Sequence, residues 1–143
     1  MRSFLFVLAS FFIIGSAVLT DHLDGNRLPT KVDLEEEAAV ADLIIVETPR
    51  PGEKISSPLV VRGKARGYWF FEGSFPVRLL DATNVEIVLG LAENPNWMTE
   101  QFVPFEVTLQ FEKPVQRFGT LVLERSDPSG RYPQALRIPV FFK

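Results

Sequence analysis

The sequence contains no cysteine and a single histidine, His22. The lack of cysteine excludes disulfides, thiolate metal ligands, a cysteine nucleophile and lipid attachment to cysteine. One histidine excludes any metal site with two histidine ligands. A Ser-His-Asp arrangement would have to use His22, which lies just after a hydrophobic N-terminal segment. The sequence therefore predicts a protein that is not an enzyme and that uses no metal or other cofactor.

An excess of positive charge is also lacking, since the 143 residues carry a formal net charge of −3. Proteins that bind nucleic acid carry clustered positive charge, so a nucleic-acid partner is not expected. Apolar residues are plentiful: 46% of the chain is hydrophobic, and 13 residues are Phe. One domain with a tail is expected at this length, with a core that needs no disulfides.

Residues 4–20 form an uncharged, strongly apolar run that follows Arg2. As a helix this run would reach roughly 25 Å, slightly short of a ~30 Å hydrocarbon core. It can be an uncleaved membrane anchor, or a signal peptide that is cut near residues 15–17. Because the positive charge precedes the run and acidic residues follow it, the rest of the chain should be extracytoplasmic. We expect a hydrophobic N-terminal helix that makes the protein single-pass, or secreted if the helix is cleaved.

Residues 21–41 are acidic and weakly hydrophobic, and Gly25 and Pro29 interrupt regular structure. This composition is typical of a solvated spacer. A short helix over residues 34–41 can form within it, with Asp33 as the N-cap. The expected organisation is a membrane anchor or signal segment, an acidic linker and one folded domain, over residues 1–20, 21–41 and 42–143.

From residue 42 onward the hydrophobic pattern has the period of two that is typical of β-strands. The clearest alternation covers residues 105–111, in which Glu106, Thr108 and Gln110 should face water. Six other runs share a β-branched or alternating composition: residues 43–46, 59–63, 75–80, 85–89, 121–123 and 136–142. Because Pro139 lies within the last run, that strand should be at a sheet edge or carry a bulge.

Turn signals such as Pro51-Gly52 and residues 126–130 separate the seven runs, and no long helix lies between them. A single antiparallel sheet would leave its apolar face in water, so two sheets must pack together. An immunoglobulin-like domain needs about 100 residues, which residues 42–143 supply. The predicted fold is an all-β, immunoglobulin-like antiparallel β-sandwich of about seven strands.

Four consecutive aromatic residues lie within residues 67–73: Tyr68, Trp69, Phe70 and Phe71. Neighbouring side chains of a strand point to opposite faces, so all four cannot enter one core. We expect Trp69 and Phe71 to fill the core while the other two cover the end of the sandwich. Alternatively, the run is exposed and contacts a partner or a sugar together with Trp97. Trp97 can instead be a hydrophobic lid over the end of the sandwich.

Carboxylates recur along the domain, mostly in alternation with core residues, so they should project separately into solvent: Glu72, Asp81, Glu86, Glu106, Glu112 and Glu124. A glycosidase needs two carboxyl groups across a cleft, one of them with a raised pKa, and nothing in the sequence indicates such a cleft. Asn84 and Asp127 are typical turn formers, not calcium ligands.

Several short motifs occur in an order that resembles a known family. They are Ile45 through Pro51-Gly52, Ser57-Pro58-Leu59 with Gly63-Lys64-Ala65, Trp69-Phe70-Phe71-Glu72 with Phe75-Pro76-Val77, Phe102-Val103-Pro104-Phe105, and Ile138-Pro139-Val140. Together, across residues 42–143, they resemble the immunoglobulin-like domain of bacterial spore germination proteins, which often accompanies GerMN modules. Asn84 stands where the family often has a turn glycine, a change that is tolerated because Asn accepts the left-handed conformation.

The resemblance implies a β-sandwich on exported or membrane-anchored bacterial proteins, with adhesion or envelope assembly as the usual role and no catalytic residues to carry over. We therefore expect a non-catalytic interaction module of the bacterial cell membrane, linked to sporulation or germination. Its partner would be another envelope protein or a cell-wall component, contacted through loops or a sheet edge. The candidate contact residues are Tyr68, Trp69, Phe70, Phe71 and Trp97.

Two alternative functions use the same domain. In the first, Tyr68, Trp69 or Trp97 stacks on sugar rings of the cell wall. In the second, the loops at one end of the sandwich inhibit a protease, an expectation that rests on analogy of fold.

Overall fold

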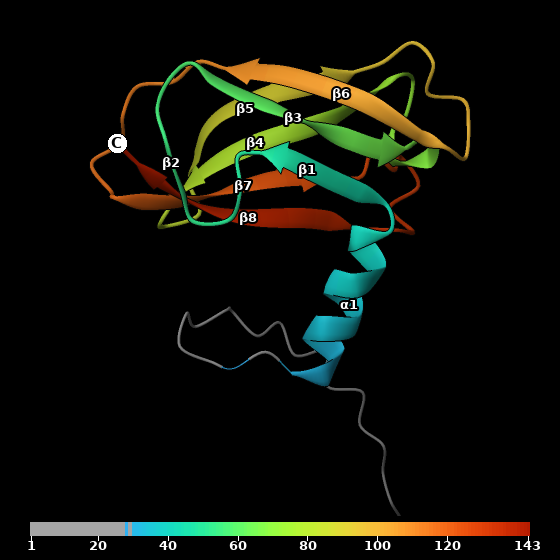
Figure 1. Ribbon diagram of the computed structural model, residues 1–143, viewed down its shortest axis with the longest axis horizontal. Helices are drawn as coiled ribbons and strands as arrows, with labels where there is room; N and C mark the ends of the chain where they lie inside the picture. Colours follow the sequence, from blue (N-terminus) through green and yellow to red (C-terminus); the bar gives the residue numbers. More distant parts are fainter. Residues whose placement is uncertain (1–27, 29) are drawn as a thin grey trace, which may run out of the picture.

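The computed structural model describes residue 28 and residues 30–143 (Figure 1). The hydrophobic helix expected over residues 1–20 lies outside the described residues and stays a prediction. Within the described part of the chain, no helix has both the length and the apolar character that a membrane span requires.

The folded part is an all-β sandwich of two sheets. The three-stranded sheet has the order β1 (Ile44–Thr48), β3 (Leu59–Arg66), β6 (Phe102–Leu109). The five-stranded sheet has the order β2 (Glu53–Ile55), β8 (Ala135–Phe142), β7 (Phe118–Glu124), β4 (Ser74–Asp81), β5 (Glu86–Glu93). Neighbouring strands are antiparallel, except that β2 and β8 are parallel. The predicted immunoglobulin-like sandwich is confirmed.

All seven predicted strands form, but the described residues contain eight, and β2 is the one that was not predicted. β2 has only three residues, and the first two are charged and exposed, so it carries no hydrophobic alternation. It forms because the chain crosses from one sheet to the other after β1 and then pairs with the free side of β8 at Val140 to Phe142.

Pro139 lies at a sheet edge, as predicted, but only the first half of β8 is an edge strand. β8 lies between β7 and β2, but its pairing with β2 begins at Val140. The carbonyl of Pro139 accepts a hydrogen bond from the N–H of Gly52, so the proline nitrogen faces the turn that precedes β2. No ladder bond is lost, because β8 is an edge strand over its first half.

The core lies between the sheets, where alternate side chains of β4, β6 and β7 meet. Phe75 packs edge-to-face against Phe105 of the opposite sheet, with ring centroids 5.0 Å apart. Phe105 and Leu109 are buried while Glu106, Thr108 and Gln110 are exposed, as the alternation predicts.

β5 turns its larger apolar side chains away from the core. Its inward positions are Val88, Gly90 and Ala92, which lie opposite the buried residues of β4. A Cβ at Gly90 would lie 2.5 Å from Cδ2 of Leu109, so the strand can approach β6 closely only with glycine there. Leu89 and Leu91 consequently lie on the outer face, where 45% and 53% of each residue is exposed.

One helix, α1 (Lys31–Ala41), precedes the sandwich and lies across the strand direction (Figure 1). The predicted helix over residues 34–41 forms, but it begins earlier, at Lys31, where Leu34 N–H donates to Thr30 C=O, so Asp33 lies inside the helix and is not its N-cap. Thr30 is also a favoured cap residue, and the helix starts there. Val40, in the last turn of α1, is buried against the domain. The C-terminal end of the predicted linker therefore packs against the sandwich.

Candidate interaction surface at the aromatic end of the sandwich

Three connections meet at one end of the sandwich, over residues 67–73, 94–101 and 125–134. The first begins with a 3-10 turn, η1 (Gly67–Trp69), and closes in a two-residue turn at Glu72 and Gly73. A Cβ at Gly67 would lie 1.9 Å from the carbonyl oxygen of Thr99, so the first two connections are in backbone contact there. The N–H of Gly67 also donates to the carbonyl of Gln101, which fastens the two connections together.

The four consecutive aromatic residues divide into a buried and an exposed pair. Trp69 and Phe70 are buried, and Phe70 packs edge-to-face against Phe75 at 4.9 Å between ring centroids. Tyr68 and Phe71 are exposed, at 43% and 42% of each residue. The expected burial of Trp69 is confirmed, but that of Phe71 was wrong, since Phe70 occupies the second core position. The 3-10 turn replaces strand alternation here, so successive side chains do not alternate between faces.

Arg125 joins two of the connections and was not predicted. Its guanidinium lies 5.6 Å from the ring centroid of Tyr68 and 5.0 Å from that of Tyr132. Its Nε donates to the carbonyl of Tyr68 at 3.2 Å, and its Nη1 donates to Oε1 of Gln134 at 2.9 Å. Tyr132 is 57% exposed. More than fifty positions separate Tyr68 from Arg125, so no local sequence pattern could have indicated this contact.

Trp97 is half-buried and packs against the core cluster. A Cβ at Gly73 would lie 3.3 Å from its ring, so the indole covers the turn that ends the aromatic run. Asn94 holds the loop in place, because its amide donates to the carbonyl of Pro104 and its side-chain oxygen accepts from Asn96 N–H. We call the surface formed by Tyr68, Phe71, Trp97, Arg125 and Tyr132 the aromatic end.

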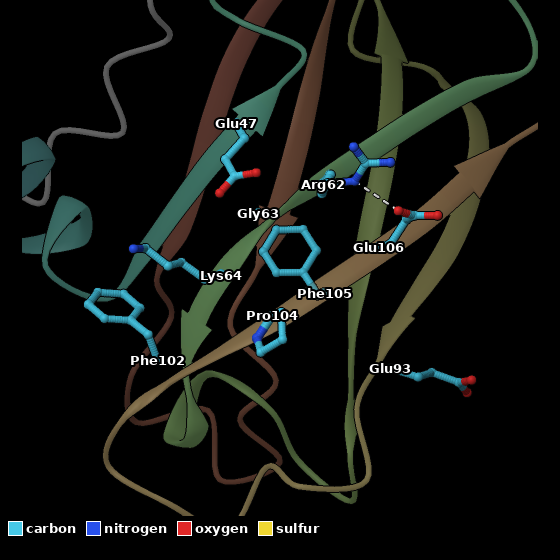
Figure 2. Close-up of a pocket in the computed structure, with 9 residues that line it drawn as sticks. All are labelled: Glu47, Arg62, Gly63, Lys64, Glu93, Phe102, Pro104, Phe105 and Glu106. Carbon is cyan, nitrogen blue, oxygen red and sulfur yellow. Dashed lines mark hydrogen bonds and ion pairs between the residues drawn. The ribbon is translucent and has the colours of Figure 1, made fainter.

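A shallow basin of about 460 Å³ lies on the outer face of the three-stranded sheet (Figure 2). Its wall carries Arg62 in an ion pair with Glu106, at 2.8 Å between Nε and Oε2. The ring of Phe102 is covered by Arg66 at 3.9 Å and approached by Lys64 at 5.4 Å. Both charge signs are thus present in the basin. Of its two aromatic rings, Phe105 is buried and Phe102 half-buried, whereas the aromatic end has three exposed rings, Tyr68, Phe71 and Tyr132.

Two aspartates stabilise turns by accepting hydrogen bonds. The pKa of Asp81 is lowered, first by the hydroxyl of Thr83 and then by the backbone N–H of Val85. The pKa of Asp127 is lowered in the same way by the hydroxyl of Ser129 and the N–H of Tyr132. Asn84 has the left-handed φ of 63° that its place in the turn requires. The prediction that Asn84 and Asp127 form turns is confirmed.

The remaining acidic side chains of the described residues lie apart from one another or pair with arginine. Among the described residues, no group of three or more His, Cys, Asp or Glu side chains is close enough to hold an ion. Glu86 and Glu124 instead both accept hydrogen bonds from Arg78 on the outer face of the five-stranded sheet.

A sequence profile of a known family covers most of the two-sheet sandwich. Residues 43–131 match the profile of Gmad2, described as the immunoglobulin-like domain of bacterial spore germination. The chain belongs to this family. The predicted resemblance is thereby confirmed over most of the sandwich, and β8 completes the fold beyond the matched residues. No curated protein matches the chain, and neither does any solved structure.

Proposed function

We propose that this Gmad2 domain is an exported, membrane-anchored and non-catalytic interaction module of the bacterial cell envelope, which contacts another envelope protein through its aromatic end. One observation carries the proposal. Tyr68 and Tyr132 are exposed beside Arg125, and Phe71 is exposed on the same connection as Tyr68, which the buried Trp69 and Phe70 hold in place. The absence of a second histidine and of cysteine in the whole chain supports a role without nucleophilic or metal chemistry.

Tyrosine and arginine are enriched among the residues that dominate interface energies. At the aromatic end both are ordered before any partner arrives, because Arg125 lies between Tyr68 and Tyr132 and is hydrogen-bonded to the backbone. Binding to such a surface loses less conformational entropy than binding to a mobile loop. The surface is therefore suited to a protein partner with an acidic or aromatic group opposite Arg125.

The position of α1 supports a partner close to the membrane. α1 meets the domain at the aromatic end, where the N–H of Arg66, the residue before η1, donates to the carbonyl of Leu43. With residues 4–20 in the bilayer, the domain would be tethered through residues 21–30 and α1, a helix about 16 Å long. The aromatic end would then be the end of the sandwich that joins the tether.

Site-specific photo-crosslinking in intact cells tests the contact surface. A photoreactive phenylalanine derivative is placed at Tyr68 or Tyr132, and at the exposed Thr108 of the three-stranded sheet as a control. We expect both aromatic-end positions to give an adduct of one size, which Arg125→Ala removes, and the control to give none. Equal adducts from Thr108, or no adduct at positions 68 and 132, would show that the aromatic end is not the contact surface.

Fractionation tests the anchoring separately. We expect the full-length chain to remain in membranes after an alkaline wash, and the folded domain to be digested by protease added outside intact protoplasts. A shortened chain in the medium would instead identify residues 1–20 as a cleaved signal peptide. Protection from the protease would contradict an extracytoplasmic domain.

The family description supports a partner that acts in spore germination. In a spore-forming host of this gene, its deletion should slow germination, and a copy with Tyr68→Ala and Tyr132→Ala should fail to restore the rate. A copy with Thr108→Ala should restore it fully. Normal germination of the deletion strain would separate this protein from germination while leaving envelope contact testable by crosslinking.

Glycan binding is the main competing outcome. Trp69 cannot stack on a sugar from its buried position, which leaves Tyr68 and the half-buried Trp97. Retention on insoluble peptidoglycan that Tyr68→Ala abolishes would favour a glycan ligand over a protein partner.

A further inference from the structure

A second pair of exposed aromatic side chains lies at the end of the sandwich opposite the aromatic end. Phe118 and Phe141 are direct partners in the ladder of β7 with β8, and 56% and 47% of these residues are exposed. On its other side Phe141 is the partner of Lys54, in the parallel ladder of β2 with β8. All three side chains therefore stand in one row on the outer face of the five-stranded sheet.

Cations surround this aromatic pair. An open hollow of about 590 Å³ is lined by the two exposed rings, by Phe142 and by three cationic side chains, those of Lys54, Arg117 and Lys143. A neighbouring hollow of about 230 Å³ shares Lys143 with the first and adds Lys113. We call the surface formed by Lys54, Arg117, Phe118, Phe141 and Lys143 the basic aromatic patch.

The cations of this surface are not paired with acids. Ion pairs within the described part of the chain join other side chains: Lys31 with Glu35, Arg62 with Glu106, and Arg78 with Glu86 and Glu124. Glu53, Asp81 and Glu112 are close in the chain, but none of them lines either hollow. Even with the carboxylate that ends this chain at Lys143, positive charge is in excess here, although the whole chain carries −3. The basic aromatic patch therefore attracts anions.

The backbone beneath the patch is fixed by hydrogen bonds between strands. The N–H of Phe142 donates to the carbonyl of Arg117, and the N–H of Lys143 donates to the carbonyl of Ile55, both at 2.9 Å. A Cβ at Gly119 would lie 2.8 Å from the ring of Phe142, so this ring packs closely against the strand that carries Phe118. The exposed rings thus project from ordered strands, and only the long cationic side chains must adjust to a ligand.

An anionic lipid bilayer offers both kinds of contact that the patch can make. Exposed Phe side chains gain free energy by leaving water for the boundary between headgroups and acyl chains, while Lys and Arg are attracted to anionic headgroups. A soluble phosphate polymer would satisfy the cations but leave both rings in water. The combination of an apolar pair with unpaired cations therefore favours a bilayer surface.

The tether permits this contact if residues 4–20 anchor the chain in the membrane. α1 lies across the strand direction (Figure 1), so a helix that stands along the membrane normal places the strands parallel to the bilayer. Residues 21–30 can add up to about 33 Å of reach. Both ends of the sandwich are then at a similar height above the bilayer, and the patch reaches it when the domain tilts.

We propose that the basic aromatic patch binds the surface of the anionic bilayer in which this chain is anchored. Phe118 and Phe141 enter the boundary between headgroups and acyl chains, and Lys54, Arg117 and Lys143 contact lipid phosphates. The contact holds the sandwich along the membrane and leaves the aromatic end free for a protein partner. This inference rests on the membrane anchor of the proposed function and adds a second membrane contact to it.

Photo-crosslinking to lipid tests the contact on the full chain reconstituted in vesicles. A photoreactive phenylalanine derivative replaces Phe118, and the vesicles contain phosphatidylcholine with or without phosphatidylglycerol. We expect lipid adducts from position 118 in the anionic vesicles, and at least about tenfold fewer in the neutral ones. Thr108 is the control position, because it is exposed on the outer face of the opposite sheet and should give few adducts in either.

Charge reversal tests the role of the cations. Lys54→Glu combined with Arg117→Glu should lower the lipid adducts from position 118 at least about tenfold in the anionic vesicles. Lys64→Glu combined with Arg131→Glu is the matched control, since it changes the net charge equally at exposed cations outside the patch. The control should leave the adducts unchanged, and circular dichroism should show both variants folded.

Flotation of the same vesicles reports the anchor separately. A chain that floats with neutral vesicles is anchored. If that chain gives equal adducts from positions 118 and 108, or keeps its adducts after charge reversal of the patch, the proposal is overturned. Flotation that requires both phosphatidylglycerol and the patch cations would support the patch and refute the anchor. A chain that floats with neither kind of vesicle would refute both. Adducts that join position 118 to a protein and not to lipid in native membranes would also overturn the proposal.

Discussion

The two ends of the sandwich are closed in different ways. At the aromatic end, Trp69 and Phe70 enter the core and cross-loop hydrogen bonds fasten three connections to each other. At the opposite end, which we call the turn end, the chain reverses over residues 56–58, 82–85 and 110–117. There, Asp81 accepts hydrogen bonds within its own turn and one from the side chain of Gln116, Ser57 accepts one from the N–H of Phe111, and Val115 is fully exposed.

This difference bears on function. Binding residues are commonly carried on loops that a rigid scaffold positions. The aromatic end meets that description, because core residues determine where its exposed side chains stand. The turn end is fastened too, by the hydrogen bonds that Ser57 and Asp81 accept from its longest connection. Among the described residues, however, only the aromatic end holds a cation, Arg125, in cation–π contact with two exposed aromatic rings. A protein partner is therefore expected at the aromatic end.

Truncation of one apolar side chain at each end, one buried and one exposed, should have the most unequal effect. Trp69→Ala removes a fully buried indole, and we expect it to lower the free energy of unfolding by roughly 3–5 kcal/mol. Val115→Ala at the turn end should change it by less than about 0.5 kcal/mol. Urea denaturation followed by circular dichroism measures both. A loss below about 1 kcal/mol for Trp69→Ala would mean that the aromatic end is not fastened through the core.

Substitutions at two glycines distinguish the cost of a steric contact from the cost of backbone strain. Gly67→Ala would place a Cβ 1.9 Å from the carbonyl oxygen of Thr99, so the loop must move, at a cost of about 1–3 kcal/mol. Gly52 has nothing within 4 Å of its Cβ position but has a φ of +77°, so Gly52→Ala should cost about 1 kcal/mol through backbone strain alone.

Asparagine is the matched probe for these two glycines, because it tolerates the left-handed conformation. Thermal denaturation should show that Gly52→Asn is milder than Gly52→Ala. Gly67→Asn should be no milder than Gly67→Ala, because its larger side chain cannot relieve a steric contact. The reverse order at Gly67 would contradict the close approach of the two loops.

Low pH should destabilise both ends of the sandwich for the same reason, because each end has an aspartate whose carboxylate accepts hydrogen bonds within a turn. The folded-state pKa values of Asp81 and Asp127 are lowered by hydrogen bonds that only the folded turns provide. Each carboxylate therefore adds stability that is present above the unfolded pKa, near 4, and that is lost as the pH falls through the lower folded pKa.

Thermal scans between pH 7 and pH 2 measure this dependence. Asp81→Asn and Asp127→Asn should each make the melting temperature less dependent on pH below about 4, since an amide does not titrate. Two variants with the full pH dependence of the natural chain would show that these turns do not contribute to it.

Only a small effect on stability should come from the residue that matters most for binding. Arg125→Ala removes two exposed cation–π contacts, and we expect a loss of about 0.5–1 kcal/mol in the free energy of unfolding. The same variant should abolish the adducts from positions 68 and 132. Loss of the adducts together with unfolding would indicate a structural role for Arg125 and not a contact with the partner.

Much of the fold followed from local pattern. Seven strands, the turns at Asn84 and Asp127 and the immunoglobulin-like class could be predicted, because alternation and turn residues act over a few neighbouring positions. β2 could not be predicted, since it forms only where β8 leaves an edge unpaired. The candidate site was only partly predicted. Tyr68 and Phe71 are exposed, while Arg125 and Tyr132 reach them through a contact between distant parts of the chain.

The sequence by itself determined that this chain folds as a sandwich of its family, because hydrophobic periodicity and turn chemistry are local properties that each segment carries. Only the tertiary structure decided which two of the four consecutive aromatics are buried, and that Leu89 and Leu91 face outward. Both outcomes depend on which strands become neighbours and how closely they approach. Gly67 and Gly90 permit those approaches, and long-range packing selects the face that each strand presents to the core.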